Sequence, residues 1–154
     1  MTKRASISYM QARIARIATH KWNLSISEIG SIFGLYQVFQ HIRDCYDLYH
    51  VEGDYAIWED LQLLFSNRNP HITELTDSMV FFEYKEDSAI DMLIGMTAEE
   101  LAEKLHTEVE NILPEFLQSR TCATLYDRDS KLWWDGPSHI AEMYLSEVRK
   151  KEDT

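Results

Sequence analysis

The chain has 154 residues, which is enough for one ordinary domain or two very small ones. A hydrophobic content of 45%, with 4 Trp, 8 Tyr and 6 Phe, can supply a core and excludes a disordered chain. No apolar run approaches the roughly 20 residues that span a bilayer, and residues 1–20 lack a signal-peptide core. Cys45 and Cys122 form no C-x-x-C motif, so we expect a cytoplasmic protein without a disulfide framework.

The net charge of −11 is unevenly distributed. Residues 1–72 hold seven basic and seven acidic side chains, whereas residues 73–154 hold eight basic and nineteen acidic ones. Residues 1–21 carry five cations and no acid. This pattern predicts a basic arm on an acidic body, which repels phosphate backbones and attracts basic clefts of proteins. Solubility alone is the alternative explanation.

The first third of the chain predicts helices. Apolar residues recur at helical spacing over residues 6–21. Ser25 and Glu28 then form a capping box that opens an apolar stripe ending near Tyr36, and a further helix is expected over residues 36–44.

Residues 45–54 are expected to be a short extended stretch that ends in a turn at Gly53. Asp54 can cap the next helix, whose apolar face consists of Ile57, Trp58, Leu61, Leu64 and Phe65. Residues 66–77 are polar, lack an apolar period and contain Pro70, so they mark the best boundary in the chain.

The second half is harder to assign. Residues 78–94 have strand composition at their start, yet their apolar residues also fit a helix, which we prefer. Thr97 and Glu100 form a second capping box, which predicts a helix that Pro114 ends or kinks.

Residues 122–134 alternate around a polar Asp-Arg-Asp-Ser turn, which predicts a β-hairpin. Gly136 and Pro137 then open a last helix. The expected fold is mainly α: a helical unit over 1–67, a linker over 68–77, and an acidic helical unit with the hairpin over 78–154.

No motif proposes a reaction. The nucleophile elbow, the P-loop and the dinucleotide fingerprint are absent, and the paired carboxylates fit solvated helix faces. His41 and Cys45 have the i, i+4 spacing of metal ligands, but no second pair follows, so a buried Cys beside a surface His is the preferred interpretation. We predict a protein that is not an enzyme, with no metal ligands and no cofactor.

A DNA-binding role is the alternative hypothesis. "LSISEIGSIFGLYQVF" resembles the start of a helix-turn-helix, and the N-terminal helix supplies four candidate phosphate contacts. These are Arg4, Arg13, Arg16 and Lys21. The competing interpretation is that this basic helix packs beside the acidic half of the chain.

Trp133 and Trp134 indicate a binding surface for another protein. Adjacent residues in a strand face opposite sides, so one tryptophan should be buried and the other at least partly exposed. Exposed Trp and Tyr anchor interfaces because they bury much area at little cost in entropy. The candidate partner-binding residues are Trp133, Trp134, Tyr126, Asp127 and Asp129. A tryptophan lid over the last helix is the structural alternative.

Residues 8–67 resemble a family of small uncharacterised bacterial proteins, through the "SISEIGSIF" segment and "YDLYHVEGDYAIWEDLQLLF". A turn motif of that family matches Tyr46, Asp47, His50 and Gly53. The second half resembles small bacterial companion proteins, through Leu125-Tyr126-Asp127 and Lys131-Leu132-Trp133. Such companions are often encoded beside toxins whose fold is similar to ADP-ribosyltransferases. The resemblance implies an antitoxin or accessory role and carries over no catalytic residue. A homo-oligomer is a separate expectation for the chain.

Overall fold

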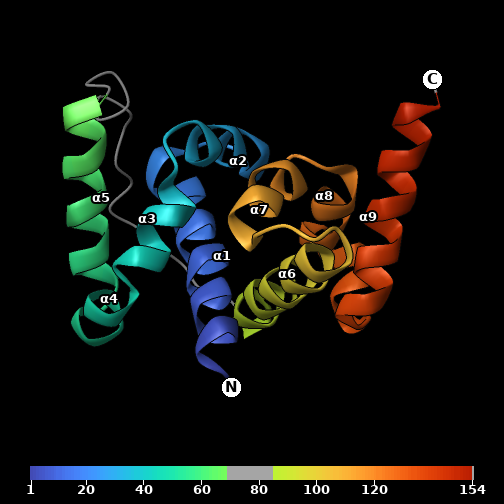
Figure 1. Cartoon of the computed structure of the whole chain (residues 1–154), viewed down its shortest axis with the longest axis horizontal. Helices are drawn as coiled ribbons and strands as arrows, with labels where there is room; N and C mark the ends of the chain where they lie inside the picture. The colour runs from blue at the N-terminus through green and yellow to red at the C-terminus, as the bar shows by residue number, and fades with distance from the viewer. Residues whose placement is uncertain (69–84, 154) are drawn as a thin grey trace.

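The computed structural model describes residues 1–68 and 85–153, and within them the side chains of residues 54, 55, 67, 68 and 85 are not described. In these ranges the backbone forms helices joined by short turns (Figure 1). The elements in chain order are α1 (Lys3–Trp22), α2 (Ile26–Leu35), α3 (Val38–Asp44), α4 (Tyr46–Glu52), α5 (Asp54–Arg68), α6 (Lys85–Lys104), α7 (Val109–Leu117), α8 (Arg120–Tyr126), the 3-10 turns η1 (Arg128–Ser130) and η2 (Leu132–Trp134), and α9 (Pro137–Glu152).

Helix α1 lies at the centre and packs against α6, which comes from the other half of the chain (Figure 1). Gly95 allows the two helices to approach closely, because a Cβ at this position would lie 3.0 Å from the carbonyl carbon of Ser8. Helices α2 and α7 meet in the same way at Gly30, where a Cβ would lie 2.9 Å from the Pro114 carbonyl oxygen. The buried apolar side chains therefore form a single cluster that contains residues of both predicted units.

Helix α2 starts as the sequence predicts. The Ser25 hydroxyl accepts a hydrogen bond from the Glu28 amide at 3.1 Å, and the Glu28 carboxylate accepts one from the Ser25 amide at 3.2 Å. The capping box is thus confirmed.

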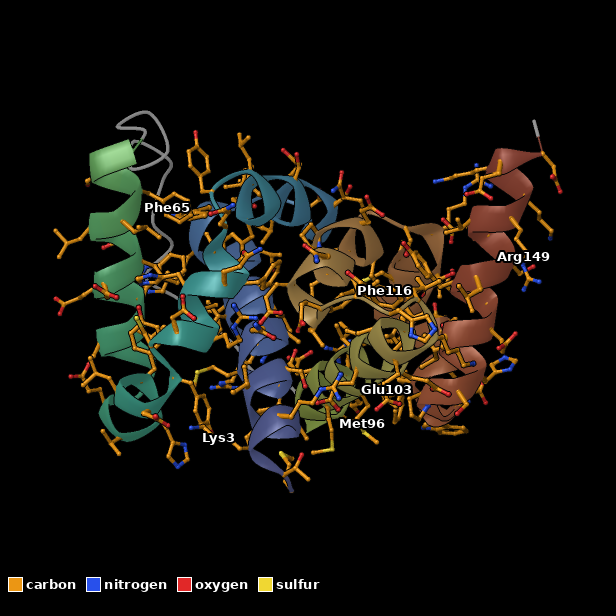
Figure 2. The ribbon with its side chains drawn as sticks, viewed as in Figure 1. Lys3, Phe65, Met96, Glu103, Phe116 and Arg149 are labelled. Carbon is orange, nitrogen blue, oxygen red and sulfur yellow. The ribbon has the colours of Figure 1, made fainter. Side chains whose placement is uncertain are left out.

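An aromatic cluster attaches α5 to the rest of the molecule. The Trp22 ring centroid lies 5.1 Å from that of Trp58 and 5.1 Å from that of Phe65, and Phe33 completes the cluster. Phe65 points from α5 toward the helices beside it (Figure 2). Three residues of the predicted α5 face besides Phe65 are buried, namely Ile57, Trp58 and Leu61, so this face is confirmed.

The stretch predicted to be extended after Cys45 is instead helix α4, so that prediction is wrong. Tyr46 and Tyr49 are both buried, and their i, i+3 spacing places them on one helical face. Aromatic residues are common in strands, and here tertiary packing overrides that preference.

The second predicted capping box is also wrong. Thr97 lies fully buried in the middle of α6, which begins at Lys85, twelve residues earlier. Helix α6 ends at Lys104, and Pro114 lies inside the separate helix α7. Of the predicted segment 78–94, residues 85–94 are helical, and residues 78–84 fall outside the described ranges, as do residues 69–77 of the predicted linker.

The β-hairpin predicted over residues 122–134 is wrong. This segment forms helix α8 and the turns η1 and η2, and no strand occurs in the described parts of the chain. Ser119 caps α8 by accepting a hydrogen bond from the Cys122 amide at 3.1 Å, and Cys122 and Leu125 are buried at helical spacing. The short alternating pattern fits both periods, and the helical one packs against the core. The last helix is confirmed, with Gly136 as its N-cap and Pro137 as its first residue.

Candidate functional site

The two tryptophans lie on the 3-10 turn η2, where they differ in exposure. Trp134 is 66% exposed, whereas Trp133 is half-buried against the core. Their ring centroids lie 5.3 Å apart in an edge-on arrangement, and the Lys131 ammonium lies 4.9 Å from the centroid of Trp134. The expectation of one exposed and one more buried tryptophan is met, but by a tight turn and not by a strand.

The other three predicted partner-binding residues differ in exposure. The Tyr126 hydroxyl is enclosed, and burial raises its pKa well above the ordinary value. Asp127 caps η1 by accepting a hydrogen bond from the Asp129 amide at 3.1 Å, and both carboxylates lie on the surface. The exposed Trp134 ring therefore has Lys131 as its charged neighbour, whereas the Tyr126 hydroxyl is enclosed.

Three basic residues of α1, Arg4, Arg13 and Arg16, face the acidic helix α6. Arg4 forms ion pairs with Glu99 at 3.8 Å and with Glu103 at 3.5 Å. Arg13 is half-buried and acts electrostatically on Asp91, while Lys21 is half-buried in the last turn of α1. The prediction that the basic helix packs beside the acidic half is confirmed, and this arrangement gives the DNA-binding hypothesis no support.

Arg16 lies deepest in this contact. Its side chain is only 3% exposed, and its guanidinium holds the fully buried Asp91 carboxylate with Nε–Oδ1 and Nη2–Oδ2 distances of 2.9 Å. Its Nη1 lies 3.7 Å from Asp87 Oδ2, and Asp87 also accepts a hydrogen bond from Arg128 at 3.1 Å. A bidentate pair of this kind is structural, and its charge is not offered to a nucleic acid.

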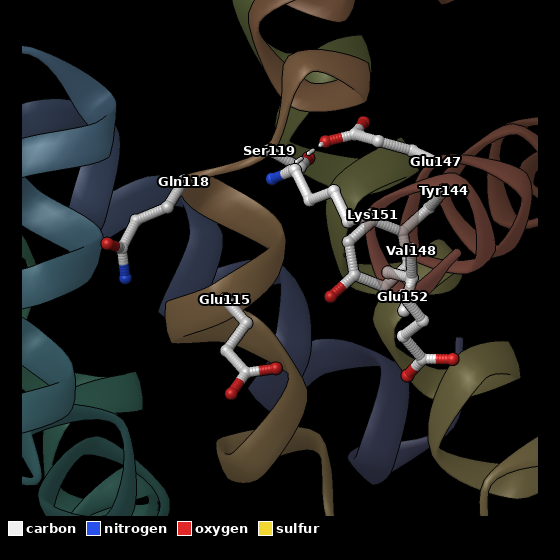
Figure 3. A pocket seen from close by; sticks show the side chains of 8 residues that line it. All are labelled: Glu115, Gln118, Ser119, Tyr144, Glu147, Val148, Lys151 and Glu152. Carbon is white, nitrogen blue, oxygen red and sulfur yellow. Dashed lines mark ion pairs between the residues drawn. The ribbon is translucent and has the colours of Figure 1, made fainter. Parts of the chain in front are cut away.

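The acidic half contains an open surface pocket of about 360 Å³ between α7 and α9 (Figure 3). Three carboxylates line it, those of Glu115, Glu147 and Glu152, and Tyr144 lies among them. Burial raises the pKa of Tyr144, and the nearby Glu115 and Glu147 raise it further, so its hydroxyl stays protonated. Lys151 also lines the pocket and lies 3.7 Å from Glu147, so part of its negative charge is already compensated.

A second cluster joins α3, α4 and α5. His41 Nε2 lies 2.9 Å from the Tyr49 hydroxyl oxygen, 3.1 Å from Asp60 Oδ2 and 3.8 Å from Cys45 Sγ. The Tyr49 hydroxyl donates a hydrogen bond to the Asp60 carboxylate. Tyr49 is buried, whereas the His41 and Asp60 side chains are 29% and 46% exposed, so the cluster opens to solvent on one side.

The electrostatics of this cluster argue against thiol chemistry. Burial raises the pKa of Cys45, and the neighbouring Asp60 carboxylate raises it further, so the side chain is a thiol and not a thiolate nucleophile. The hydrogen bond from Tyr49 lowers the pKa of Asp60 despite its partial burial. Burial and the bond to Asp60 both raise the pKa of Tyr49.

Residues 14–68 match the model of an uncharacterised family, described as "Protein of unknown function (DUF3791)". The match extends from Ile14 in α1 to the end of α5, so it includes the whole His41 cluster and excludes Trp133 and Trp134. The expected resemblance of residues 8–67 to an uncharacterised family is thereby confirmed. Neither a curated protein nor a solved structure matches the chain.

The DUF3791 segment contains two cluster residues that the sequence interpretation missed. His41 and Cys45 were visible as an i, i+4 pair, but Asp60 lies fifteen residues beyond Cys45, on a different helix. Tyr49 was assigned to an extended stretch. The only sequence signal that relates the four is the short spacing of α3, α4 and α5, because single residues separate these helices.

The described helices include none with the length and apolar character needed to cross a membrane.

Proposed function

We propose that this chain is a non-enzymatic protein-binding module that neutralises a basic partner. The observation that carries this proposal is the exposure of Trp134, which leaves 66% of a large aromatic side chain in solvent. Residues of this type dominate binding energy at protein interfaces when a partner covers them. The edge contact with Trp133 holds the ring in place, so little conformational entropy is lost on binding.

The charge of the acidic half supports a basic partner. Asp127, Asp129 and Asp135 lie on the surface around the tryptophan turn. The pocket between α7 and α9 adds the carboxylates of Glu115 and Glu152 on the same half of the chain, whereas that of Glu147 is occupied by the α8 amides and Lys151. A negative field over this region would accelerate encounter with a positively charged surface and fix its orientation.

The resemblance of the second half to companion proteins suggests the identity of the partner. It favours a toxin whose fold is similar to ADP-ribosyltransferases, so that the role of this chain would be that of an antitoxin or accessory protein. A toxin that binds NAD or nucleic acid needs a basic cleft, and the acidic half fits such a cleft by charge.

The test is to purify the tagged chain from its native host, identify any partner retained in 1:1 amount, and measure that partner's affinity for single variants. Trp134→Ala should weaken binding by about 2 kcal/mol, or roughly 30-fold, as expected for an interface anchor. Its unfolding free energy should change by less than about 1 kcal/mol, because the ring is mostly exposed.

Leu63→Ala is the matched control, since Leu63 on α5 is similarly exposed and lies outside the acidic half. It should bind with unchanged affinity. Retention of full affinity by Trp134→Ala, or a chain that purifies without any stoichiometric partner, would contradict the proposal.

A further inference from the structure

Three side chains with metal-binding atoms converge where α3, α4 and α5 meet. They are His41 from α3, Cys45 from the joint between α3 and α4, and Asp60 from α5. One ligand atom of each lies within 4.8 Å of the other two. We propose that these three residues bind a single Zn²⁺ ion, an inference that is independent of the protein-binding role.

The spacing of the three atoms fits the coordination sphere of zinc. Zn–N, Zn–O and Zn–S bonds of about 2.0–2.3 Å place neighbouring ligand atoms of a tetrahedral site about 3.3–3.6 Å apart. The observed distances from His41 Nε2 are 3.1 Å to Asp60 and 3.8 Å to Cys45. The Cys45 sulfur and the Asp60 oxygen lie within 4.8 Å of each other. Side-chain shifts of up to about 1 Å therefore complete the site.

The donor set selects the class of cation. One thiolate, one imidazole and one carboxylate form a mixed set that suits Zn²⁺, whereas Mg²⁺ and Ca²⁺ require oxygen ligands. On binding, the metal takes the sulfur lone pair of Cys45, and the thiol proton leaves to solvent. Three protein ligands leave a fourth position for water.

Tyr49 acts as a positioning residue in this site. Its hydroxyl donates to the Asp60 carboxylate, so it orients the oxygen that would meet the metal. Groups that orient metal ligands in this way strengthen binding. The alternative is a hydrogen-bond network of Tyr49, His41 and Asp60, which needs no cysteine. The Cys45 sulfur nevertheless lies near the same atoms, and this distinguishes a metal site from such a network.

The site is accessible, and its occupation would have a structural effect. His41, Cys45 and Asp60 are all partly exposed, so a hydrated ion can reach them from solvent. Helix α5 lies at one edge of the molecule (Figure 1), where it contacts α4, the aromatic cluster around Trp22 and, through Asp60, His41 of α3. An ion shared by α3 and α5 would replace the His41–Asp60 contact between them with coordinate bonds.

The full chain, freed of metal with a chelator, is titrated with Zn²⁺ alone in competition with a chromophoric chelator. We expect one equivalent to bind with a Kd of about 1 μM or tighter. Cys45→Ser and Asp60→Asn should each weaken binding at least about 10–100-fold, which is the loss seen even for groups outside the metal's direct ligands. Glu59→Gln and Cys122→Ala are the matched controls and should leave Zn²⁺ affinity unchanged, because Glu59 is exposed and Cys122 is buried on α8, outside the three helices of the cluster.

Co²⁺ provides a second readout that reports the sulfur ligand directly. The Co²⁺ form of the chain should show a sulfur-to-metal charge-transfer band in the near ultraviolet, and this band should disappear in Cys45→Ser but not in Cys122→Ala. Circular dichroism spectra recorded in chelator establish that each variant folds. If one of the ligand variants does not fold, His41→Gln takes its place in the titration. Zn²⁺ binding weaker than about 100 μM, or equal affinities of wild type, Cys45→Ser and Asp60→Asn, would overturn the proposal.

Discussion

Two carboxylates in this protein each meet a basic side chain, and their surroundings differ. Asp91 is completely enclosed between α1 and α6 and is held by two hydrogen-bonding nitrogens of Arg16. Asp60 is 46% exposed and contacts His41 and Tyr49 on the solvent side of α5. The first carboxylate has its bonding capacity filled by protein, and the second retains room for a ligand.

The pKa shifts of Asp91 and Asp60 differ in the same way as their exposure. Burial raises the pKa of Asp91 even though Arg16 donates hydrogen bonds to it. The hydrogen bond from Tyr49 lowers the pKa of Asp60, where the burial penalty is smaller. The sealed pair, Arg16–Asp91, therefore stabilises the fold, whereas the open pair, His41–Asp60, is available to bind a ligand.

The largest effect is expected at the sealed pair. Asp91→Ala would leave the Arg16 guanidinium in the interior without its main partner, which costs about 3–5 kcal/mol of unfolding free energy. Urea denaturation at pH 7 measures this loss. Asp47→Ala is the control, because the Lys3–Asp47 pair has a comparable distance of 2.9 Å but lies on the surface and should cost less than about 1 kcal/mol. Equal losses in the two variants would show that enclosure does not distinguish these sites.

Glu147 is an intermediate case, with a side chain that is 14% exposed. From α9 it accepts hydrogen bonds from the Arg120 amide at 3.0 Å and from the Thr121 amide and hydroxyl at 2.9 and 2.8 Å, so it caps α8 across the chain. Burial raises its pKa, but these hydrogen bonds outweigh that effect and hold the pKa below its ordinary value of 4.5. Glu147→Gln should lose about 1–2 kcal/mol at pH 7.

The stability difference between wild type and Glu147→Gln should depend on pH in a definite direction. A depressed carboxyl pKa stabilises the folded state above the unfolded-state pKa, and the stabilisation is lost as pH falls through the folded-state pKa. The difference between wild type and Glu147→Gln should therefore be constant near neutral pH and shrink below about pH 4. Denaturant midpoints measured from pH 3 to pH 7 test this. A difference that grows on acidification would contradict the assigned role of the carboxylate.

The sequence predicts the start of a helix correctly where contacts between neighbouring residues form the cap. Ser25 and Glu28 cap a helix through contacts within four residues, and Gly136-Pro137 opens α9 through backbone geometry alone. Thr97 and Glu100 show the same signature inside α6, where Thr97 is buried. The motif is identical in both places, and only the upstream residues from Lys85 decide whether a helix is already present.

Tertiary contacts explain what the sequence could not show. Helix α8 was predicted as a strand because its short apolar pattern fits both periods, and part of its cap comes from Glu147, more than twenty residues away. Asp60 joins His41 and Cys45 only because α5 folds back beside α3. Arg16 is a candidate phosphate contact in the sequence, and its burial depends on Asp91, seventy-five residues later in the chain. None of these pairings has a fixed spacing that a single sequence reveals.

The smallest effect is expected at the open site in the absence of metal. Asp60→Asn keeps an oxygen that can accept the Tyr49 hydrogen bond, so in chelator it should cost less than about 1 kcal/mol, as for an exposed ion pair. Zinc should then separate the variants: at 100 times the wild-type Kd it would stabilise the wild type by about 2.7 kcal/mol and Asp60→Asn, with a Kd at least about 10-fold weaker, by no more than about 1.4 kcal/mol. Asp91→Ala, although much less stable, should keep the zinc response, because its defect lies in the α1–α6 contact. A loss of 3 kcal/mol or more by Asp60→Asn in chelator would instead make the open cluster a structural element like the sealed one.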